Sequence, residues 1–143
     1  MKTKVLILGS SSFAGSSFTD FLIQKKKYKI LGTYNSKKNL KKLIFKNSLN
    51  KFKLIKLDLN KEKNSLLKIV KSFKPEYIFD FASVCMVNES WDAPDYYFRV
   101  NLNSKINFIQ NMHNLLFIKK FIYVGTPEIF GSTLKPVKEN SLI

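Results

Sequence analysis

The sequence predicts an α/β domain built on a doubly wound parallel sheet of about five strands, with helices on both faces. Short apolar runs alternate with longer amphipathic segments along the chain. The runs lack a regular alternation of apolar and polar residues, which is typical of strands that are buried on both faces. The chain has 143 residues, 45% of them hydrophobic. This size suits one globular domain and leaves little room for a second.

Five short runs are rich in Ile, Val, Phe and Tyr and are predicted to be strands. They span residues 4–8, 28–33, 52–57, 77–81 and 121–124. The segments between them are predicted to be helices, at residues 13–24, 39–45, 64–73 and 95–116. In the first of these, Phe18, Phe21 and Leu22 recur at helical spacing. Because strands and helices alternate strictly, right-handed crossovers should make the strands parallel.

The net charge of +15 is concentrated in the first half of the chain. Residues 1–74 contain 19 lysines and three acidic residues, whereas residues 75–143 contain six basic and seven acidic residues. Such a basic half is compatible with an anionic partner, including nucleic acid. However, nearly all the basic residues are Lys, and Lys, Asn, Ile and Phe are all abundant, as an AT-rich coding bias would produce. We therefore expect no nucleic-acid partner and keep nucleic-acid binding as an alternative.

Cys85 is the only cysteine, so no internal disulfide is possible and a reducing compartment is expected. The apolar run at residues 5–8 is shorter than the ~7–15 residues of a signal-peptide core. No run approaches the ~18 apolar residues that a membrane span needs. The sequence therefore predicts a cytoplasmic protein without a membrane partner.

A phosphate-binding turn is predicted directly after the first strand. Residues 9–15 read GSSSFAG and lead straight into the first predicted helix. Small residues let the backbone approach a pyrophosphate, while the amides and dipole at a helix N-terminus favour its charge. We predict contacts with a dinucleotide from Gly9, Ser12, Phe13, Ala14 and Gly15. The alternative is a turn whose serines cap the helix and which binds no ligand.

At this turn the sequence resembles the extended short-chain dehydrogenase/reductase family, the NAD(P)-dependent epimerases and dehydratases of nucleotide sugars. The family loop reads G-x-x-G-x-x-G; Gly9 and Gly15 match its first and third glycines, and Ser12 replaces the second. The resemblance implies a Rossmann-like sheet over residues 1–143 that is C-terminally incomplete and lacks the substrate domain. It also implies a nucleotide-sugar substrate and allows a homodimer in the full-length form.

The end of the second strand bears on the choice between NADP and NAD. An acidic residue there would bind the ribose 2′-hydroxyl and repel a 2′-phosphate. Where the family's acid usually stands, this chain has Thr33, followed by Tyr34, Asn35 and the pair Lys37 and Lys38. No carboxylate is near in the sequence and two ammonium groups are. We therefore favour NADP over NAD, with Thr33, Tyr34, Asn35 and Lys38 as cofactor-binding residues.

Two further segments carry the resemblance on the cofactor side. Asp58 and Leu59 resemble the family's D-L pair, which contacts the adenine. The alternative for Asp58 is that it caps the following helix. Residues 80–83 read DFAS where the family has H-L-A-A, whose backbone lines the cofactor. The remaining cofactor contacts implied in this way are Phe81, Ala82, Ser83 and Asn101, the last within a segment that resembles 4,6-dehydratases.

The loop after the fifth strand resembles the catalytic segment S-[ST]-x-E-x-Y-G. Residues 125–131 read GTPEIFG. The resemblance places Thr126 at the hydroxyl that binds the sugar C4 oxygen and Glu128 at the base that removes the C5 proton. Pro127 replaces the acid of the 4,6-dehydratases, and Phe130 replaces the usual Tyr. The alternative is an ordinary Thr-Pro turn with a solvated Glu.

The resemblance implies a 4,6-dehydratase acting on a sugar such as dTDP-glucose or GDP-mannose, or else a 4-epimerase or reductase of the same family. The family's Tyr-x-x-x-Lys pair is expected just beyond Ile143, so little turnover is expected of the chain as written. A truncated domain that only binds the dinucleotide, or that folds poorly, is a further alternative, because one sheet edge would stay open.

Overall fold

The structure is a computed structural model that describes residues 2–37, 43–61, 64–112 and 114–141. Five parallel strands form one sheet in the order β3-β2-β1-β4-β5. The strands are β1 (Thr3–Leu8), β2 (Tyr28–Tyr34), β3 (Lys53–Lys56), β4 (Tyr77–Asp80) and β5 (Lys120–Tyr123). The predicted doubly wound Rossmann-like sheet is confirmed, and the strand order changes direction between β1 and β4.

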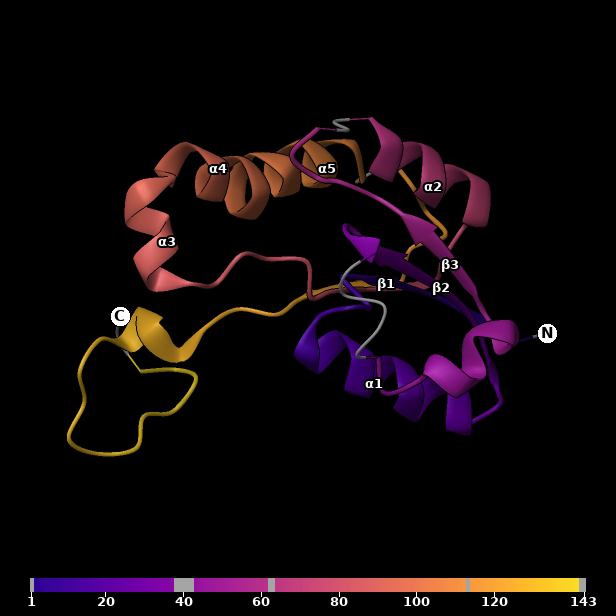
Figure 1. Cartoon of the computed structure of the whole chain (residues 1–143), viewed down its shortest axis with the longest axis horizontal. Helices are drawn as coiled ribbons and strands as arrows, with labels where there is room; N and C mark the ends of the chain where they lie inside the picture. The colour runs from indigo at the N-terminus through magenta and orange to yellow at the C-terminus, as the bar shows by residue number, and fades with distance from the viewer. Residues whose placement is uncertain (1, 38–42, 62–63, 113, 142–143) are drawn as a thin grey trace.

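Helices cover both faces of the sheet, as predicted (Figure 1). α1 (Phe13–Gln24) lies on one face, while α2 (Ser65–Phe73) and α5 (Ser104–Met112) lie on the other. Successive side chains of β1 point to opposite faces of the sheet. Val5 and Ile7 pack in the core under α1. Leu6 and Leu8 pack in the core under α2 and α5. These four side chains are at most 1% exposed. This double burial explains why the strand shows no polar alternation.

Two of the predicted helices agree closely with the structure, and a third is interrupted. α1 has the predicted bounds, and α2 begins one residue later than predicted. The predicted helix at 95–116 is present as α4 (Pro94–Phe98), a π-helical turn η3 (Arg99–Asn103) and α5, which ends at Met112. The prediction is wrong for residues 114–116, which are not helical. A π turn inserts an extra residue into the helical repeat, which periodicity in the sequence does not reveal.

The prediction of a helix at residues 39–45 is wrong where it can be compared. Residues 39–42 lie outside the described residues, and residues 43–45 are not helical: a turn at residues 44–45 follows Leu43. Leu43 and Phe45 are nevertheless buried, Phe45 against the ring of Phe52. Their spacing therefore reflects burial in a loop. A 3-10 helix, η2 (Lys46–Lys51), follows instead and leads into β3.

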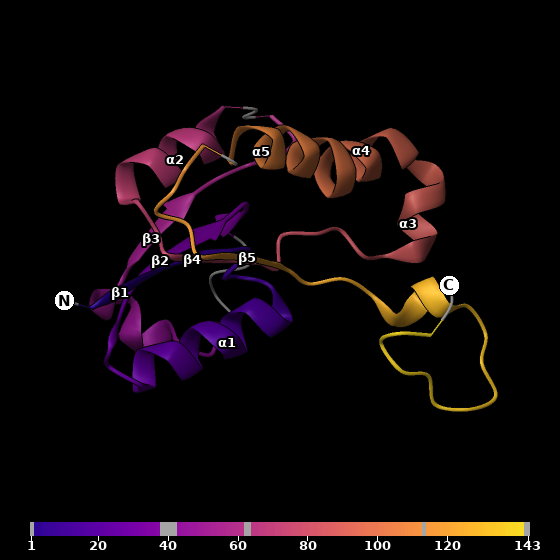
Figure 2. The same cartoon turned by 180° about the vertical axis from the view of Figure 1, so that it is seen from behind.

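The chain beyond β5 extends away from the sheet (Figures 1 and 2). A short 3-10 helix, η4 (Pro127–Phe130), follows β5 there, and α3 (Val87–Asp92) lies in the long connection after β4. Nearly every described residue from Tyr123 onward is exposed. Among the described residues, no helix is long and apolar enough to cross a membrane.

Candidate cofactor-binding site

Gly9 ends β1 in a backbone conformation that favours glycine. Its φ is +68°, and a Cβ there would lie 2.8 Å from the backbone of Phe81 and Ala82 at the end of β4. The Gly9 amide donates to Thr33 Oγ1 at 3.0 Å, and the Ser10 hydroxyl donates to the Thr33 carbonyl at 2.8 Å. The first loop is thus hydrogen-bonded to the end of β2 and packs closely against the end of β4, so only a residue without a Cβ fits at its start.

Ser12 caps α1, and its side chain accepts a hydrogen bond from the Gly15 amide at 3.1 Å. Its φ of −73° suits any L-residue, so serine is accommodated where the family pattern has its second glycine. Gly15 packs on the start of the loop, and a Cβ there would lie 2.3 Å from the Gly9 carbonyl oxygen. The two retained glycines are therefore those that the local packing requires.

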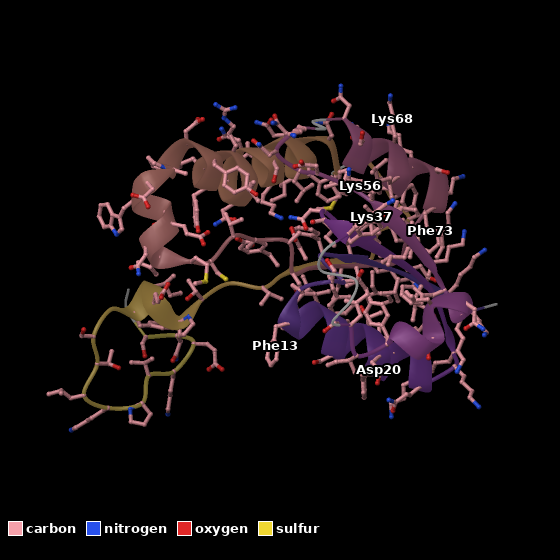
Figure 3. All side chains as sticks on the ribbon, in the orientation of Figure 1. Phe13, Asp20, Lys37, Lys56, Lys68 and Phe73 are labelled. Atoms are coloured by element: carbon pink, nitrogen blue, oxygen red, sulfur yellow. The ribbon has the colours of Figure 1, made fainter. Side chains whose placement is uncertain are left out.

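The first turn of α1 presents backbone donors to solvent. Within the described residues, no hydrogen bond is found for the amides of Phe13 and Ala14. Both residues are exposed, and Phe13 projects from the start of the helix (Figure 3). Unpaired amides at a helix N-terminus, together with the helix dipole, attract an anion. This end of the loop can hold a phosphate group.

A cleft opens beside this loop, at the carboxyl edge of the sheet where the strand order changes direction. The loop contributes to its lining, as do the ends of β2, β3 and β4. Ten of the predicted cofactor residues line it: Gly9, Ser12, Thr33, Tyr34, Asn35, Asp58, Leu59, Phe81, Ala82 and Ser83. Residues that are distant in the sequence therefore meet at one place.

Five predicted cofactor residues do not line the cleft or cannot be placed in it. Gly15 is buried behind the loop, and Phe13 and Ala14, in the first turn of α1, are exposed and do not line the cleft. Asn101 lies behind the segment that follows β4. Lys38 lies outside the described residues.

The end of β2 offers hydroxyl and amide groups to the cleft. Thr33 is 2% exposed because its side chain and carbonyl bind the first loop. Tyr34 and Asn35 follow at the rim. Asp58, at the end of β3, is the acidic residue of the lining. As far as the structure describes it, the cleft wall at β2 is thus polar without a carboxylate of its own.

Asp58 closes a turn after β3. Its Oδ1 accepts a hydrogen bond from the Asn60 amide at 3.0 Å. α2 begins at Ser65 after Asn64, so the alternative that Asp58 caps this helix is wrong. The turn keeps Asp58 and Leu59 at the cleft, where both line its wall.

A buried ion pair lies beneath the segment after β4. Lys105 Nζ lies 2.5 Å from Asp80 Oδ2, with the side chains 7% and 0% exposed, respectively. The same ammonium donates to the Ala82 carbonyl at 2.8 Å, and Asp80 Oδ1 accepts from the Ala82 amide at 2.9 Å. Sequence reasoning did not single out Lys105, since one Lys among 24 on a helix carries no distinguishing local signal.

Burial and pairing shift the pKa values of Asp80 and Lys105 in opposite directions. Burial raises the pKa of the Asp80 carboxyl, and the nearby ammonium of Lys105 opposes that shift. Burial likewise lowers the pKa of Lys105, and the Asp80 carboxylate opposes it. Burial has the larger effect on both groups, so the pKa of Asp80 stays above and that of Lys105 below its ordinary value, and each group partly offsets the cost of burying the other.

Asn101 fixes the next residue of the same segment. Its side-chain oxygen accepts from the Val84 amide at 2.9 Å, and its side-chain nitrogen donates to the Val84 carbonyl at 2.8 Å. Both polar atoms of the Asn101 side chain are thus already hydrogen-bonded to the Val84 backbone, and the predicted contact with a cofactor would compete with these bonds. Asn101 and Lys105 are four residues apart and together connect the η3–α5 helix to the segment after β4.

Thr126 and Glu128 lie close together, on the exposed segment beyond β5. The Thr126 hydroxyl donates to Glu128 Oε2 at 3.2 Å, and it caps η4 by accepting from the Glu128 amide. Both residues are exposed, and neither lines the cleft. The arrangement brings a hydroxyl and a carboxylate side by side. A turn with a solvated Glu would contain the same contacts.

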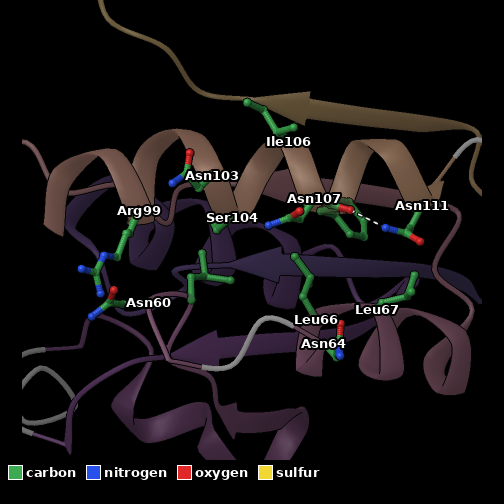
Figure 4. Close-up of a pocket in the computed structure, with 12 residues that line it drawn as sticks. Asn60, Asn64, Leu66, Leu67, Arg99, Asn103, Ser104, Ile106, Asn107 and Asn111 are labelled. Atoms are coloured by element: carbon green, nitrogen blue, oxygen red, sulfur yellow. Dashed lines mark hydrogen bonds between the residues drawn. The ribbon is translucent and has the colours of Figure 1, made fainter. Parts of the chain in front are cut away.

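A second, larger cavity of about 490 Å³ lies between α2 and the η3–α5 helix (Figure 4). Five asparagines contribute to its lining: Asn60, Asn64, Asn103, Asn107 and Asn111. Arg99 at its end pairs with Asp95. The residues predicted to bind the cofactor do not meet there; of those that the structure describes, only Leu59 reaches its wall. No group of three or more metal-binding side chains occurs within the described part of the chain.

The comparisons with known proteins agree with this fold. The family model for GDP-mannose 4,6 dehydratase matches residues 6–142, nearly the whole chain. The chain belongs to the GDP-mannose 4,6-dehydratase family. The predicted resemblance to NAD(P)-dependent epimerases and dehydratases is thereby confirmed.

Curated relatives of this family member are UDP-glucose 4-epimerases. The protein from Mycoplasma genitalium is 28% identical over 134 residues, which are 92% of this chain and 38% of the relative. The protein from Mycoplasma pneumoniae is 26% identical over 144 residues, covering 99% of this chain and 41% of the relative. The chain thus spans about two fifths of the length of the curated relatives it matches.

Solved structures with the same fold include a dehydratase and an epimerase. The dTDP-glucose 4,6-dehydratase of Bacillus anthracis, in complex with NAD, has a TM-score of 0.76 at 18% identity over 99% of this chain and 44% of that one. The UDP-glucuronic acid 4-epimerase of Bacillus cereus, in complex with UDP-glucuronic acid and NAD, has a TM-score of 0.79 at 23% identity. That match covers 98% of this chain and 45% of the epimerase.

Proposed function

We propose that this chain is the dinucleotide-binding part of an NAD(P)-dependent nucleotide-sugar 4,6-dehydratase. The observation that carries the proposal is the first loop. Gly9 has a positive φ against the end of β4, and Gly15 packs on the Gly9 carbonyl. The amides of Phe13 and Ala14 bind no other group of the described chain. Small residues and unpaired amides at a helix start are what a pyrophosphate requires.

The cleft supports the rest of the dinucleotide. Asp58 and Leu59 at the end of β3 suit the adenine, and Thr33, Tyr34 and Asn35 suit the adenosine ribose. The segment from Phe81 to Ser83 completes the opposite wall. The shared position of these residues around one cleft is the reason for proposing a single extended ligand.

NADP is the cofactor that we favour. Among the described residues, the lining of the cleft at β2 carries no carboxylate to repel a 2′-phosphate, and Lys37 follows on the exposed side. The NAD seen in the two structural neighbours belongs to proteins of 18% and 23% identity. Titration of the chain with NADH and NADPH under identical conditions separates the two, and we expect the tighter binding for NADPH.

The proposed chemistry at the sugar uses Thr126 and Glu128. The Thr126 hydroxyl would hydrogen-bond the C4 oxygen, and the Glu128 carboxylate would accept the C5 proton while the C6 hydroxyl leaves as water with a proton from solvent. A bound nicotinamide dinucleotide would supply the hydride chemistry at the sugar. The proximity of the hydroxyl to the carboxylate is compatible with a shared role at one substrate, and the match of both residues to the family's catalytic segment is the reason for proposing it.

A 4-epimerase is the second candidate, because the curated relatives are UDP-glucose 4-epimerases. Either activity belongs to a protein of the relatives' length. Cofactor binding is therefore the primary test for this chain, with the quenching of intrinsic fluorescence by NADPH as the readout. Saturable binding supports the proposal. No binding at millimolar cofactor by the folded chain would contradict it.

A further inference from the structure

The conformation of the segment after β4, residues 81–84, is fixed by hydrogen bonds to other groups of the protein. Each of its four backbone amides donates to another group of the chain. The acceptors are the Leu8 carbonyl at 2.9 Å for Phe81, Asp80 Oδ1 at 2.9 Å for Ala82, the Phe81 carbonyl at 3.1 Å for Ser83 and Asn101 Oδ1 at 2.9 Å for Val84. A ligand in the cleft therefore meets a wall whose shape is determined before it binds.

Lys105 provides the most deeply buried of these connections. Its ammonium reaches Asp80 Oδ2 at 2.5 Å and the Ala82 carbonyl at 2.8 Å, and it lies 5.7 Å from the centre of the Tyr123 ring. Asp80 holds the Ala82 amide at the same time. Both polar groups of the Ala82 backbone are thus held by one ion pair, directly behind the cleft wall that Phe81, Ala82 and Ser83 form.

We infer that the Asp80–Lys105 ion pair is a positioning pair for dinucleotide binding, which fixes the Phe81–Ser83 wall of the cleft through the Ala82 backbone. This inference rests on the proposed cofactor function. Neither side chain lines the cleft, so both act on the ligand through Ala82. The family pattern has H-L-A-A where this chain has DFAS, so the acid of the pair departs from that pattern.

Stability alone is a weak reason for such a pair. Replacing a buried ion pair by well-packed apolar side chains is often neutral or even stabilising, whereas removing one partner is costly. Apolar side chains would, however, leave the Ala82 carbonyl without the donor that Lys105 supplies. The inference therefore concerns the affinity for the cofactor among variants that are equally well folded, so the experiment must measure both the affinity and the folded state.

The test compares the dissociation constant for NADPH among the wild type, Lys105→Met and two matched controls. Lys119→Met removes an equal charge from the Lys119–Glu76 pair, whose Lys is well exposed and does not line the cleft. Val70→Ala removes methyl groups from a fully buried position in α2 and lowers global stability without touching the cleft. All titrations are run at a temperature where circular dichroism shows each variant folded.

We expect Lys105→Met to weaken NADPH binding by about tenfold or more, the effect of losing one well-placed hydrogen bond. Both controls should stay within about twofold of the wild type. Amide hydrogen exchange supplies a local readout. The Ala82 amide should exchange faster in Lys105→Met, while the Gly15 amide, which is held by Ser12, should be unchanged.

A second variant covers the case in which Lys105→Met does not fold. Asp80→Asn combined with Lys105→Met leaves no unpaired buried charge, and the side-chain amide oxygen introduced by Asp80→Asn can still accept from the Ala82 amide. We expect this double variant to fold and to bind NADPH about tenfold more weakly, because the Ala82 carbonyl has lost its donor.

Three results would overturn the inference: binding within twofold of wild type in a folded Lys105 variant, an equal loss in Val70→Ala, or failure of both Lys105 variants to fold. The last two would assign the pair to stability alone. A folded wild-type chain that binds no NADPH would instead contradict the proposed function.

Discussion

Gly15 lies against the carbonyl of Gly9, so close that a Cβ on Gly15 would approach its oxygen to 2.3 Å. The contact joins the first turn of α1 to the end of β1 and sets the shape of the loop between them. It also explains which glycines of the family pattern this chain retains, since Ser12, at the remaining position, has an ordinary negative φ. The loop therefore packs α1 against the end of β1, in addition to being a candidate anion site.

Gly15→Ala tests that relationship. The added methyl group must push α1 away from β1, because the nearest obstacle is backbone rather than a flexible side chain. We expect a loss of at least about tenfold in NADPH affinity, measured by fluorescence titration, with a lowered melting temperature. Ser17→Ala, on the exposed face of the same helix, is the control and should change neither quantity. Unchanged NADPH affinity in Gly15→Ala would show that cofactor binding does not depend on the close packing of Gly15 on Gly9.

Asn35→Asp should decide how the end of β2 treats a 2′-phosphate. The substitution is nearly isosteric and places a carboxylate at the rim of the cleft. Repulsion should weaken NADPH binding by about fivefold to tenfold, while NADH binding changes little. Asn88→Asp, exposed on α3, is the control for a mere change of net charge. An equal loss of affinity for NADPH and NADH would show that Asn35 does not lie near the 2′-phosphate.

Ser12→Ala removes the cap of α1 and the acceptor of the Gly15 amide. The loss in unfolding free energy should be about 1 kcal/mol, within the range of about 0.5–2 kcal/mol for such caps. Urea denaturation monitored by circular dichroism measures it. Ser90→Ala, in the short helix α3, serves as a comparison where no such cap is lost. Equal stability of Ser12→Ala and the wild type would show that the Ser12 cap contributes nothing to folding.

Glu76 and Lys119 predict a specific pH dependence of stability. The hydrogen bond from Lys119 lowers the pKa of Glu76 below its ordinary value of 4.5. A carboxyl whose pKa is lower in the folded state stabilises the fold above its unfolded pKa, and that contribution is lost as the pH falls through the folded value. Melting curves of the wild type and Lys119→Met should therefore differ above about pH 5 and converge in acid. A constant difference at all pH values would contradict this origin.

Glu128→Gln tests the proposed base without requiring the hydride steps. In deuterated water, a 4-keto-6-deoxy nucleotide sugar should exchange its C5 hydrogen when the enzyme supplies a positioned carboxylate. We expect Glu128→Gln to slow that exchange by about 10²–10⁴-fold. Glu139→Gln, another exposed carboxylate of the same C-terminal segment, is the control. Exchange at the wild-type rate in Glu128→Gln would assign the C5 proton to another group.

Local patterns were sufficient for most of the fold. The apolar runs predicted all five strands to within two residues. For the central strand β1 the reason is burial on both faces, which needs continuous apolar sequence. The Ser-rich loop and helical spacing predicted α1 with the observed bounds. The prediction failed at residues 43–45, where Leu43 and Phe45 are buried without being helical. Periodicity reports which side chains are buried, and a helix is only one way to bury them.

The fold class, the first loop and the points where strands end could be predicted because they depend on near neighbours along the chain. Residues from four strand ends could also be placed at a common edge, because parallel strands all end there. The pairing of Lys105 with Asp80 across 25 residues, and the use of the Asn101 amide by Val84, emerged only from the folded chain. The same holds for the hydrogen bond from the first loop to the Thr33 side chain. Such pairings depend on how helices dock on the sheet, and among so many lysines and asparagines no local pattern marks the one that becomes buried.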